Sequence, residues 1–461
     1  MGHLLRRSQL TPELLVAKYA LGPYINTESG RKIIDASGGA AVGSVGASTP
    51  EVVAEIVAQY SKIQYVSPSI FTNEPAEKLA NEIITDRYDR MGYSKVMFVN
   101  SGSEANESAY KIARQHFFDK NETERVNTIT RDIAYHGNTV IALQLSSIST
   151  KKEPFEDIVQ CQKFHQVEAP HPFHRKRKGE SDIEYLERLA EELESKFQEL
   201  GPSTVMAVWF ESFLGTTGGC VRPPKGYFEA VRSICNKFGA IFVVDEVICG
   251  SGRCGKHFFA WEHEIEESNG NEDYLKVQPD LITFGKSISG GYAPLSGIVI
   301  HKKFFDKAET TSKVFNSGHT FQSHPVSCAA ALAVQRYIKR HNLLNNVEKM
   351  GQYLGEQLKE QTRDLKCVLD VRGIGFFWAV ELVKDKKTRE PFPLDYNFAT
   401  IAYNCILNHG VAVYPGRGTI DGLYGYSFMV SPAFTSDKDL LDKIVSAIRM
   451  GLEDALAMQE M

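Results

Sequence analysis

The sequence predicts an α/β protein, with a mostly parallel, doubly wound sheet in a large domain and a smaller α+β domain beside it. Two observations predict this architecture. Through the middle of the chain, short apolar runs typical of strands alternate with helical segments. Toward both ends, amphipathic helices and a strand pair around a glycine turn replace that alternation. The chain has 461 residues, 43% of them hydrophobic, so it is long enough for two or three domains.

Six runs predict the strands of the large sheet: residues 95–100, 127–135, 203–211, 240–246, 280–285 and 295–300. The last four are apolar with little alternation, which indicates strands covered by helices on both faces. Apolar residues at helical spacing predict the intervening helices at 104–118, 183–200 and 224–239.

The two ends of the chain predict the second domain. Amphipathic helices are expected at 50–62 and 73–90, and a long helical run begins near residue 325. After it we expect a strand pair at 368–383 and then another helix. A short β run at 411–415 and a closing helix at 437–458 complete the chain. We therefore expect residues 1–60 to join a C-terminal small domain of residues 316–461, and residues 61–315 to form the large domain.

Composition argues against several classes of protein. The net charge of -5 and the pI near 6.3 give no indication of a nucleic-acid partner, and no apolar run reaches the length of a membrane span. The N-terminus is too polar for a secretory signal, although an amphipathic transit peptide stays open. Eight scattered cysteines without a CxxC pair predict no metal site and fit reduced thiols in the cytoplasm.

A glycine-rich turn, "VNSGSEAN" at 99–106, joins a predicted strand to a predicted helix. A helix N-terminus presents free N–H groups and a positive dipole end, which suit a phosphate. Gly102 allows close approach of the backbone, and Ser103 offers an N–H and a hydroxyl. The alternative is an ordinary helix N-cap.

An acidic residue and an aromatic residue follow two other predicted strands. In "VVDEV", Asp245 ends a buried strand, where open α/β sheets bind ligands, and a protonated ring nitrogen would give it a cationic partner. Val247 is placed to pack under a flat ring. In "AYHGNT", Tyr135 precedes His136 and a glycine, and its ring is suited to stacking on a planar heteroaromatic group. The alternatives are a turn-capping aspartate and a core tyrosine.

A lysine follows the strand in "LITFGKSISGG" and is surrounded by small residues. Taken alone, Lys286 fits a surface loop. Beside a phosphate cradle, an acid and an aromatic ring, a desolvated lysine is suited to forming a Schiff base, because it is nucleophilic as the free amine. These four features in one chain predict pyridoxal 5'-phosphate (PLP) as cofactor.

The chain resembles the class III aminotransferases, which are PLP enzymes of fold type I. The resemblance covers nearly the whole length. It is carried by "NSGSEAN", "AYHGNT", "VVDEVICGSGRCGKHFFAWE", "PDLITFGKSISGGYAPLSG" and "GHTFQSHPVSCAAALAV". It implies that residues 61–315 form the PLP-binding domain.

The resemblance also implies a role for each matching residue. Lys286 would form the Schiff base and move the proton, and Asp245 would keep the pyridine nitrogen protonated. Val247 and Tyr135 would sandwich the ring. The remaining matching positions are expected to contact the cofactor: Gly102 and Ser103 at the phosphate, His136, Glu211, and Thr320 reaching from the neighbouring subunit. The active site would then lie at the interface of a homodimer.

Substrate-binding positions are less well defined by the resemblance. Glu211 matches the glutamate of the family's Glu-Pro strand end, although Ser212 replaces the proline. Thr216 stands where several relatives that handle ω-amino acids have a second glutamate, which argues against an ornithine or 4-aminobutyrate type of switch. Arg417 matches a position that binds a carboxylate in some relatives, and the alternative is a solvent-facing loop arginine. Ser67 and Phe71, together with Tyr135, are expected to shape the pocket; an ordinary loop is the alternative for the segment around Ser67.

Three functions are compatible with these residues. The first is a transaminase that moves an amino group from an amine or amino acid to a keto acid such as pyruvate or 2-oxoglutarate. The second is an aminomutase, epimerase or decarboxylase that uses the same lysine. The third is a catalytically silent dimer that serves as a binding or structural protein.

Overall fold

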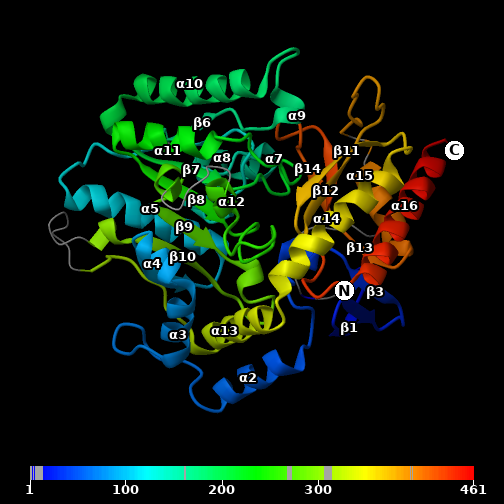
Figure 1. Ribbon diagram of the computed structural model, residues 1–461, viewed down its shortest axis with the longest axis horizontal. Helices are drawn as coiled ribbons and strands as arrows, with labels where there is room; N and C mark the ends of the chain where they lie inside the picture. The colour runs from blue at the N-terminus through cyan, green and yellow to red at the C-terminus, as the bar shows by residue number, and fades with distance from the viewer. Residues whose placement is uncertain are drawn as a thin grey trace.

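The computed structural model describes residues 3, 5, 14–159, 162–266, 273–305, 314–394, 396 and 398–460. Its centre is a seven-stranded sheet with the order β4-β10-β9-β8-β7-β5-β6 (Figure 1). The strands are β4 Tyr93–Val99, β5 Asn127–Arg131, β6 Phe164–Val167, β7 Val205–Glu211, β8 Ile241–Glu246, β9 Leu281–Phe284 and β10 Ser296–His301. Strand β10 is antiparallel to both of its neighbours, β4 and β9, and the other neighbouring pairs are parallel. The mostly parallel sheet predicted from the sequence is confirmed.

Helices cover both faces of this sheet. Strand β8 shows why apolar and polar residues do not alternate along the central strands. Ile241 and Val243 pack on one face with helix α5, whereas Phe242 and Val244 pack on the other with α10 and α11. These helices are α5 Gly102–Asp119, α10 Asp182–Leu200 and α11 Tyr227–Phe238. Because each face buries apolar side chains, successive residues of β8 are all hydrophobic up to Asp245.

The C-terminal part of the chain contributes strands to two further four-stranded sheets with helices against them. One has the order β11-β12-β15-β14 and is antiparallel, and the other joins β1, β2 and β3 to β13. The strands are β1 Ala17–Leu21, β2 Tyr24–Thr27, β3 Lys32–Asp35, β11 Val368–Ile374, β12 Phe377–Leu382, β13 Val411–Ala412, β14 Tyr414–Arg417 and β15 Tyr426–Val430. The helices are α13 Pro325–Arg340, α14 Leu343–Thr362, α15 Phe398–Asn408 and α16 Lys438–Glu460.

The N-terminal segment packs with the C-terminal part, on the right of Figure 1. Strand β3 pairs in parallel with β13, with Ile34 opposite Val411. Val45 and Val52 share a hydrophobic core with residues of α14 and α16. We propose on this basis that the N-terminal segment and the C-terminal part form one domain, with the boundaries expected above.

Two elements predicted from the sequence differ in detail from those of the structure. The helix expected at 73–90 is divided into α3 Glu74–Ile83 and α4 Asp86–Arg90, with Ile84 and Thr85 between them. The β run expected at 411–415 belongs to two sheets, because β13 pairs with β3 and β14 pairs with β15. The helix expected at 50–62 is α2 Pro50–Tyr60.

Among the helices that the structure describes, none combines the length and the apolar character of a membrane span. The seven cysteines that the structure describes are all free and buried, and Cys161 lies outside the described residues, as does most of the N-terminus before residue 14. No group of His, Cys, Asp or Glu in the described ranges is arranged to hold a metal ion.

Candidate active site

Five predicted site residues come from the carboxyl ends of parallel strands. Glu211 ends β7, Asp245 is the penultimate residue of β8, and Lys286 follows β9 by two positions. Tyr135 follows β5, and Gly102 follows β4 as the first residue of α5. Since parallel strands end at the same edge of a sheet, side chains far apart in sequence meet there.

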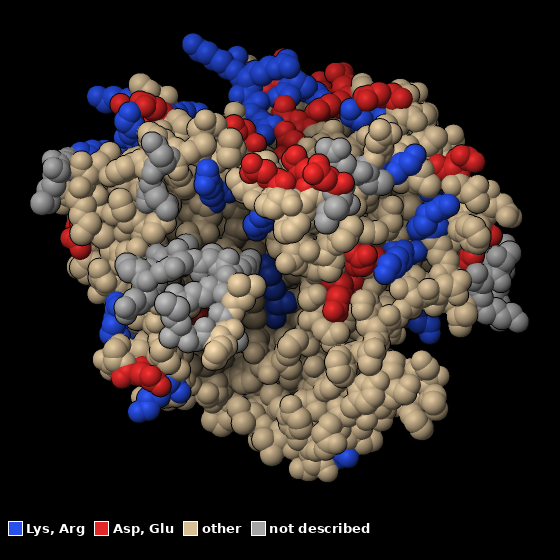
Figure 2. Space-filling model, turned by 180° about the vertical axis from the view of Figure 1, so that it is seen from behind, with Lys and Arg blue, Asp and Glu red and all other residues tan. Residues whose placement is uncertain are grey.

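These residues line one cavity of about 180 Å³. Eight of the predicted site residues take part in its wall: Gly102, Ser103, Tyr135, His136, Glu211, Asp245, Val247 and Lys286. The wall also contains Ala40, Asn106, Gly137, Lys151, Gly215, Thr216, Ile248 and Tyr414. In the space-filling view, a hollow opens near the middle of one face, and basic side chains are visible inside it (Figure 2).

Asp245 is held in one orientation by three donors. Its Oδ2 accepts a hydrogen bond from Asn106 Nδ2 at 2.7 Å and lies 2.8 Å from His136 Nδ1, while its Oδ1 accepts from the Val247 N–H at 2.9 Å. Asn106 is fixed in turn by Thr283, whose hydroxyl donates to Asn106 Oδ1 at 2.9 Å. The carboxylate is therefore ready to accept from a further donor in the cavity without reorganisation.

Lys286 combines an unusual backbone with a perturbed amine. Its φ of 47° lies in the left-handed region, which L residues rarely adopt and which concentrates at functional sites. Burial lowers the pKa of Lys286 from 10.5 to about 8, although Asp245 and Glu211 oppose the shift. Gly285 precedes it because a Cβ there would lie 2.4 Å from Ser296 Oγ. A larger share of Lys286 is thus the nucleophilic free amine near neutral pH than of an ordinary lysine.

The first turn of α5 packs closely against Val247. A Cβ added to Gly102 would lie 2.6 Å from Val247 Cγ1, so only glycine lets this turn approach the valine that was predicted to pack under a ring. Ser103 Oγ accepts from the Asn138 N–H at 3.1 Å, which ties the helix start to the loop after Tyr135. Gly102 and Ser103, the first two residues of the 18-residue helix α5, line the cavity, so the positive end of the helix dipole lies beside it.

Replacing Gly102 by Ala should weaken cofactor binding. The added methyl group must push Val247 out of place, and that shift narrows the cavity where the flat ring is predicted to lie. We expect the Kd for PLP, measured by fluorescence titration of the apoprotein, to rise roughly tenfold or more. Thermal unfolding of the apoprotein is the control, since alanine is well suited to a first helical turn. An unchanged Kd would contradict the close packing described above.

Glu211 and Tyr135 are fixed to each other. Glu211 Oε1 accepts from the Tyr135 N–H and Oε2 from the Gly215 N–H, both at 3.0 Å. Burial raises the pKa of Glu211, and the nearby His136 opposes that shift. Both carboxylate oxygens of Glu211 thus bind backbone N–H groups, so this residue orders two loops of the cavity wall.

Four predicted site residues lie outside the Lys286 cavity of this chain. Ser67 and Phe71 belong to the turn after α2, and Thr320 is exposed in the segment before α13. These two segments meet each other, because the rings of Tyr65 and Phe321 form an edge contact at 5.7 Å. Ser67, Phe71 and Thr320 are therefore not part of the Lys286 cavity formed by a single chain.

Arg417 is the fourth predicted residue outside the cavity. It is exposed at the end of β14, where its Nε donates to the Leu423 carbonyl at 3.2 Å. Tyr414, three residues earlier on the same strand, does line the cavity. Carboxylate binding by Arg417 stays a prediction from the family resemblance.

Sequence reasoning missed two polar residues of the cavity wall. Asn106 was within the quoted "NSGSEAN" turn, one helical turn after Gly102, and its place facing Asp245 could have been found from that spacing. Lys151 lies on the short helix α7 Ser149–Lys152, with its Nζ 4.0 Å from the centre of the Tyr135 ring. Nothing near Lys151 in the sequence marks it, because its neighbours are those of a polar surface segment.

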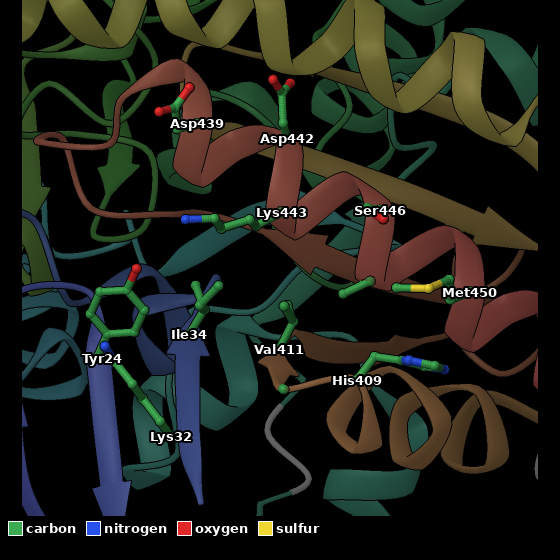
Figure 3. Close-up of a pocket in the computed structure, with 12 residues that line it drawn as sticks. Tyr24, Lys32, Ile34, His409, Val411, Asp439, Asp442, Lys443, Ser446 and Met450 are labelled. Atoms are coloured by element: carbon green, nitrogen blue, oxygen red, sulfur yellow. The ribbon is translucent and has the colours of Figure 1, made fainter.

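The residues present fit PLP. The cavity has a carboxylate for a protonated ring nitrogen, a lysine with lowered pKa for an aldehyde, a helix N-terminus for a phosphate, and a glycine whose missing Cβ leaves room beside Val247. A larger cavity of about 690 Å³ lies between β2, β3 and α16 (Figure 3). Its wall contains none of the predicted site residues. The Asp and Lys residues of this wall are Lys32, Asp439, Asp442 and Lys443, and they are not combined with a glycine-rich helix start as in the Lys286 cavity.

Comparison with known proteins agrees with this geometry. A family profile described as aminotransferase class-III matches residues 6–452. An aminotransferase of Gibberella zeae is 38% identical, over 97% of this chain and 85% of its own length. An uncharacterised aminotransferase of Schizosaccharomyces pombe is 37% identical, over 95% of this chain and 92% of its own. A probable gamma-aminobutyrate transaminase of Oryza sativa is 30% identical, over 95% and 87%.

Solved structures show the same fold. An (S)-enantioselective omega-transaminase from Thermomicrobium roseum superposes with a TM-score of 0.87 and 28% identity, covering 99% of this chain and 97% of that one. A transaminase from work on directed evolution by ancestral reconstruction gives a TM-score of 0.89 at 27% identity, with coverage of 99% and 97%. The chain therefore belongs to the class III aminotransferases, and it is an aminotransferase with their fold type I architecture.

Proposed function

We propose that this aminotransferase uses PLP, bound covalently by Lys286, to move an amino group from an amine or amino acid to a keto acid such as pyruvate or 2-oxoglutarate. The observation that carries the proposal is the meeting of Lys286 and Asp245 in one cavity at the carboxyl edge of the sheet. When bound, PLP supplies an electron sink for the electrons released as a proton leaves the substrate carbon.

The chain's own residues then have distinct tasks. Asp245, oriented by Asn106 and His136, would keep the ring nitrogen of the cofactor protonated. Lys286 Nζ, as the neutral amine, would take a proton from the substrate carbon and give it to the former aldehyde carbon of the cofactor. Tyr135 and Val247 would lie against the two faces of the ring. Gly102 and Ser103 would bind the phosphate at the start of α5.

Product analysis tests the proposed reaction. The purified protein, loaded with PLP, is incubated with a panel of amines and amino acids together with pyruvate or 2-oxoglutarate. Transamination must form alanine from pyruvate or glutamate from 2-oxoglutarate, in amounts equal to the carbonyl product. A product that forms without any keto acid would instead indicate an aminomutase, epimerase or decarboxylase. A protein that takes up no PLP would favour the silent dimer.

We further propose that the enzyme is a homodimer whose active sites are completed across the interface. Exposed apolar residues extend along α2 and the turn after it, and the lower part of the face in Figure 2 carries few charged side chains. The exposed residues there are Val53, Val57, Tyr60, Ile63, Tyr65, Ile70 and Phe71, with Phe321 beside them. Such a patch is typical of an interface, and it contains the segments of Ser67, Phe71 and Thr320.

Mixed dimers test whether Thr320 acts on the partner's site. We expect Lys286→Ala and Thr320→Asp to be inactive as homodimers, since aspartate would repel a phosphate. The heterodimer pairs one Lys286→Ala chain with one Thr320→Asp chain. If each site uses its own Lys286 and the partner's Thr320, this heterodimer contains one intact site and should recover up to about half of wild-type activity per dimer. If both residues act within one chain, both sites are damaged and no activity returns.

The cytoplasmic location and the absence of nucleic-acid and membrane partners stay predictions from the sequence. The net charge of -5 supports the expectation that the protein does not bind nucleic acid. The seven described cysteines, free and buried, fit the expectation of reduced thiols. Fractionation of cells that express the tagged protein would test the location.

A further inference from the structure

The cavity wall contains equal numbers of carboxylate and lysine side chains. Among the lining residues that the structure describes, the carboxylates are Glu211 and Asp245, and the lysine and arginine side chains are Lys286 and Lys151. Glu211 and Asp245 are engaged by backbone and side-chain donors. Lys286 is reserved for the cofactor under the proposed function. Lys151 is the other lysine of the described wall, and the proposed mechanism assigns it no task.

Lys151 occupies a distinct place at the cavity. Its Nζ lies over the Tyr135 ring at 4.0 Å from the centre, so the ammonium group is directed to the same wall as the proposed stacking residue. Lys151 is an exposed residue that also contributes to the cavity wall. The adjacent Lys152 points elsewhere and donates to the Gln144 carbonyl at 3.2 Å. The charge of Lys151 also acts across the cavity, since it contributes to lowering the pKa of Lys286.

We propose that Lys151 is a specificity-determining residue that binds a carboxylate on the substrate, at the end of the molecule away from the reacting amine. The inference rests on the proposed transaminase function. A substrate with its amine at Lys286 and an acid group reaching the cavity mouth would pair with the Lys151 ammonium. The preferred substrates are then amino acids and keto acids that carry a carboxylate beyond the reacting carbon, in preference to alkylamines with an uncharged tail.

Arg417 was the residue predicted from the sequence for carboxylate binding. It is exposed at the end of β14, and its Nε donates to the Leu423 carbonyl. Lys151, in contrast, is part of the cavity wall in the arrangement described. The two residues thus offer different acid-binding positions, and of the two only Lys151 lies in the described wall of the Lys286 cavity.

Equilibrium binding and turnover together test the proposal. The variants are Lys151→Met, the conservative Lys151→Arg, and Lys178→Met as a control that removes the same charge from an exposed loop. Binding of glutarate, which has two carboxylates and no amine, is measured by calorimetry on the PLP-loaded protein. The turnover assay compares β-alanine, 4-aminobutyrate and 5-aminopentanoate with the alkylamines of equal length, and PLP affinity is measured separately.

The expected result is selective. In Lys151→Met, the Kd for glutarate and the KM of at least one amino acid of the series should rise roughly tenfold, while the values for alkylamines and PLP stay within about twofold. Lys151→Arg should retain most of the preference, and Lys178→Met should behave as wild type. Equal losses for acids and alkylamines, an increased Kd for PLP, or no change at all would overturn the proposal.

The same experiment separates this proposal from the proposed function. A wild-type protein that forms neither alanine nor glutamate with any donor contradicts the transaminase function. If its glutarate binding still depends on Lys151, the acid-binding role of this residue is supported even so. If wild-type protein transaminates but Lys151→Met keeps every preference, the function stands and the acid-binding role is wrong.

Discussion

Lys286→Ala should abolish transamination, with activity reduced by at least roughly four orders of magnitude, because the variant lacks both the nucleophile and the proton carrier. The lysine side chain projects from a left-handed residue at the end of β9, and no other lysine of the described cavity wall follows a strand of the sheet. The measurement is alanine formation from pyruvate with the best donor found. Cofactor should still bind noncovalently, since Asp245 and the start of α5 are unchanged. Wild-type turnover in this variant would refute the assignment.

The lowered pKa of Lys286 gives the same prediction a pH dependence. Below a pH of about 8 the amine is mainly protonated, and above it the amine is free to attack the aldehyde of PLP. Because burial lowers this pKa from 10.5, the capture rate should rise with pH and level off above about 8. Stopped-flow absorbance of apoprotein mixed with PLP measures the rate. A rate that continues to rise toward pH 10 would mean that the amine is not desolvated as described.

Asp245→Asn should reduce kcat by roughly a hundredfold or more while the protein stays folded. An amide is a poor partner for a protonated ring nitrogen, so the ring loses its positive charge and with it most of its power to accept electrons. Asn106 and His136 would lose a charged acceptor as well. The matched control is Asp182→Asn at the exposed start of α10, which should keep wild-type activity.

A cofactor analogue makes the role of Asp245 specific. PLP methylated on the ring nitrogen carries a permanent positive charge and needs no acid partner. In Asp245→Ala, which also leaves room for the methyl group, this analogue should restore part of the activity that ordinary PLP does not support. Absence of any recovery, with the analogue shown to bind, would indicate that Asp245 acts by ordering the cavity and not through the ring charge.

The positions of Asp245, Glu211 and Lys286 could be predicted because they depend on strand ends. Continuous apolar runs identify buried parallel strands, and the carboxyl ends of such strands share one edge. The turn at Gly102 was recognisable because a strand, a glycine and a helix follow each other within a few residues. Local sequence therefore determined which side chains face the cavity at the sheet edge.

Other parts depend on contacts between distant segments, which local patterns do not encode. Buried Arg253 donates to the carbonyls of Gly43 at 2.8 Å and Pro432 at 2.7 Å and to the hydroxyl of Ser287 at 3.3 Å, so it ties both chain ends to the segment after Lys286. Nothing in the sequence around Arg253 indicates those partners. Division of the 411–415 run between two sheets was equally hidden, because the run is continuous and its partners come from opposite ends of the chain.

The location of three other predicted residues, Thr320, Ser67 and Phe71, could not be predicted from the sequence for a different reason. Their roles came from the family resemblance, and within one chain they lie together on an exposed apolar surface away from Lys286. A site completed by a second subunit has no pattern in one sequence, since the contacting residues need no fixed spacing from the cavity residues. The heterodimer experiment addresses that question directly.

Borohydride reduction of the PLP-loaded enzyme, followed by digestion and peptide mass spectrometry, tests the central claim most directly. Reduction fixes the cofactor to the amine that holds it. Our account predicts one modified peptide, carrying the pyridoxyl group on Lys286, and no modification at Lys151 or elsewhere at comparable yield. A cofactor fixed to another lysine, or none fixed in a protein that binds PLP, would contradict it.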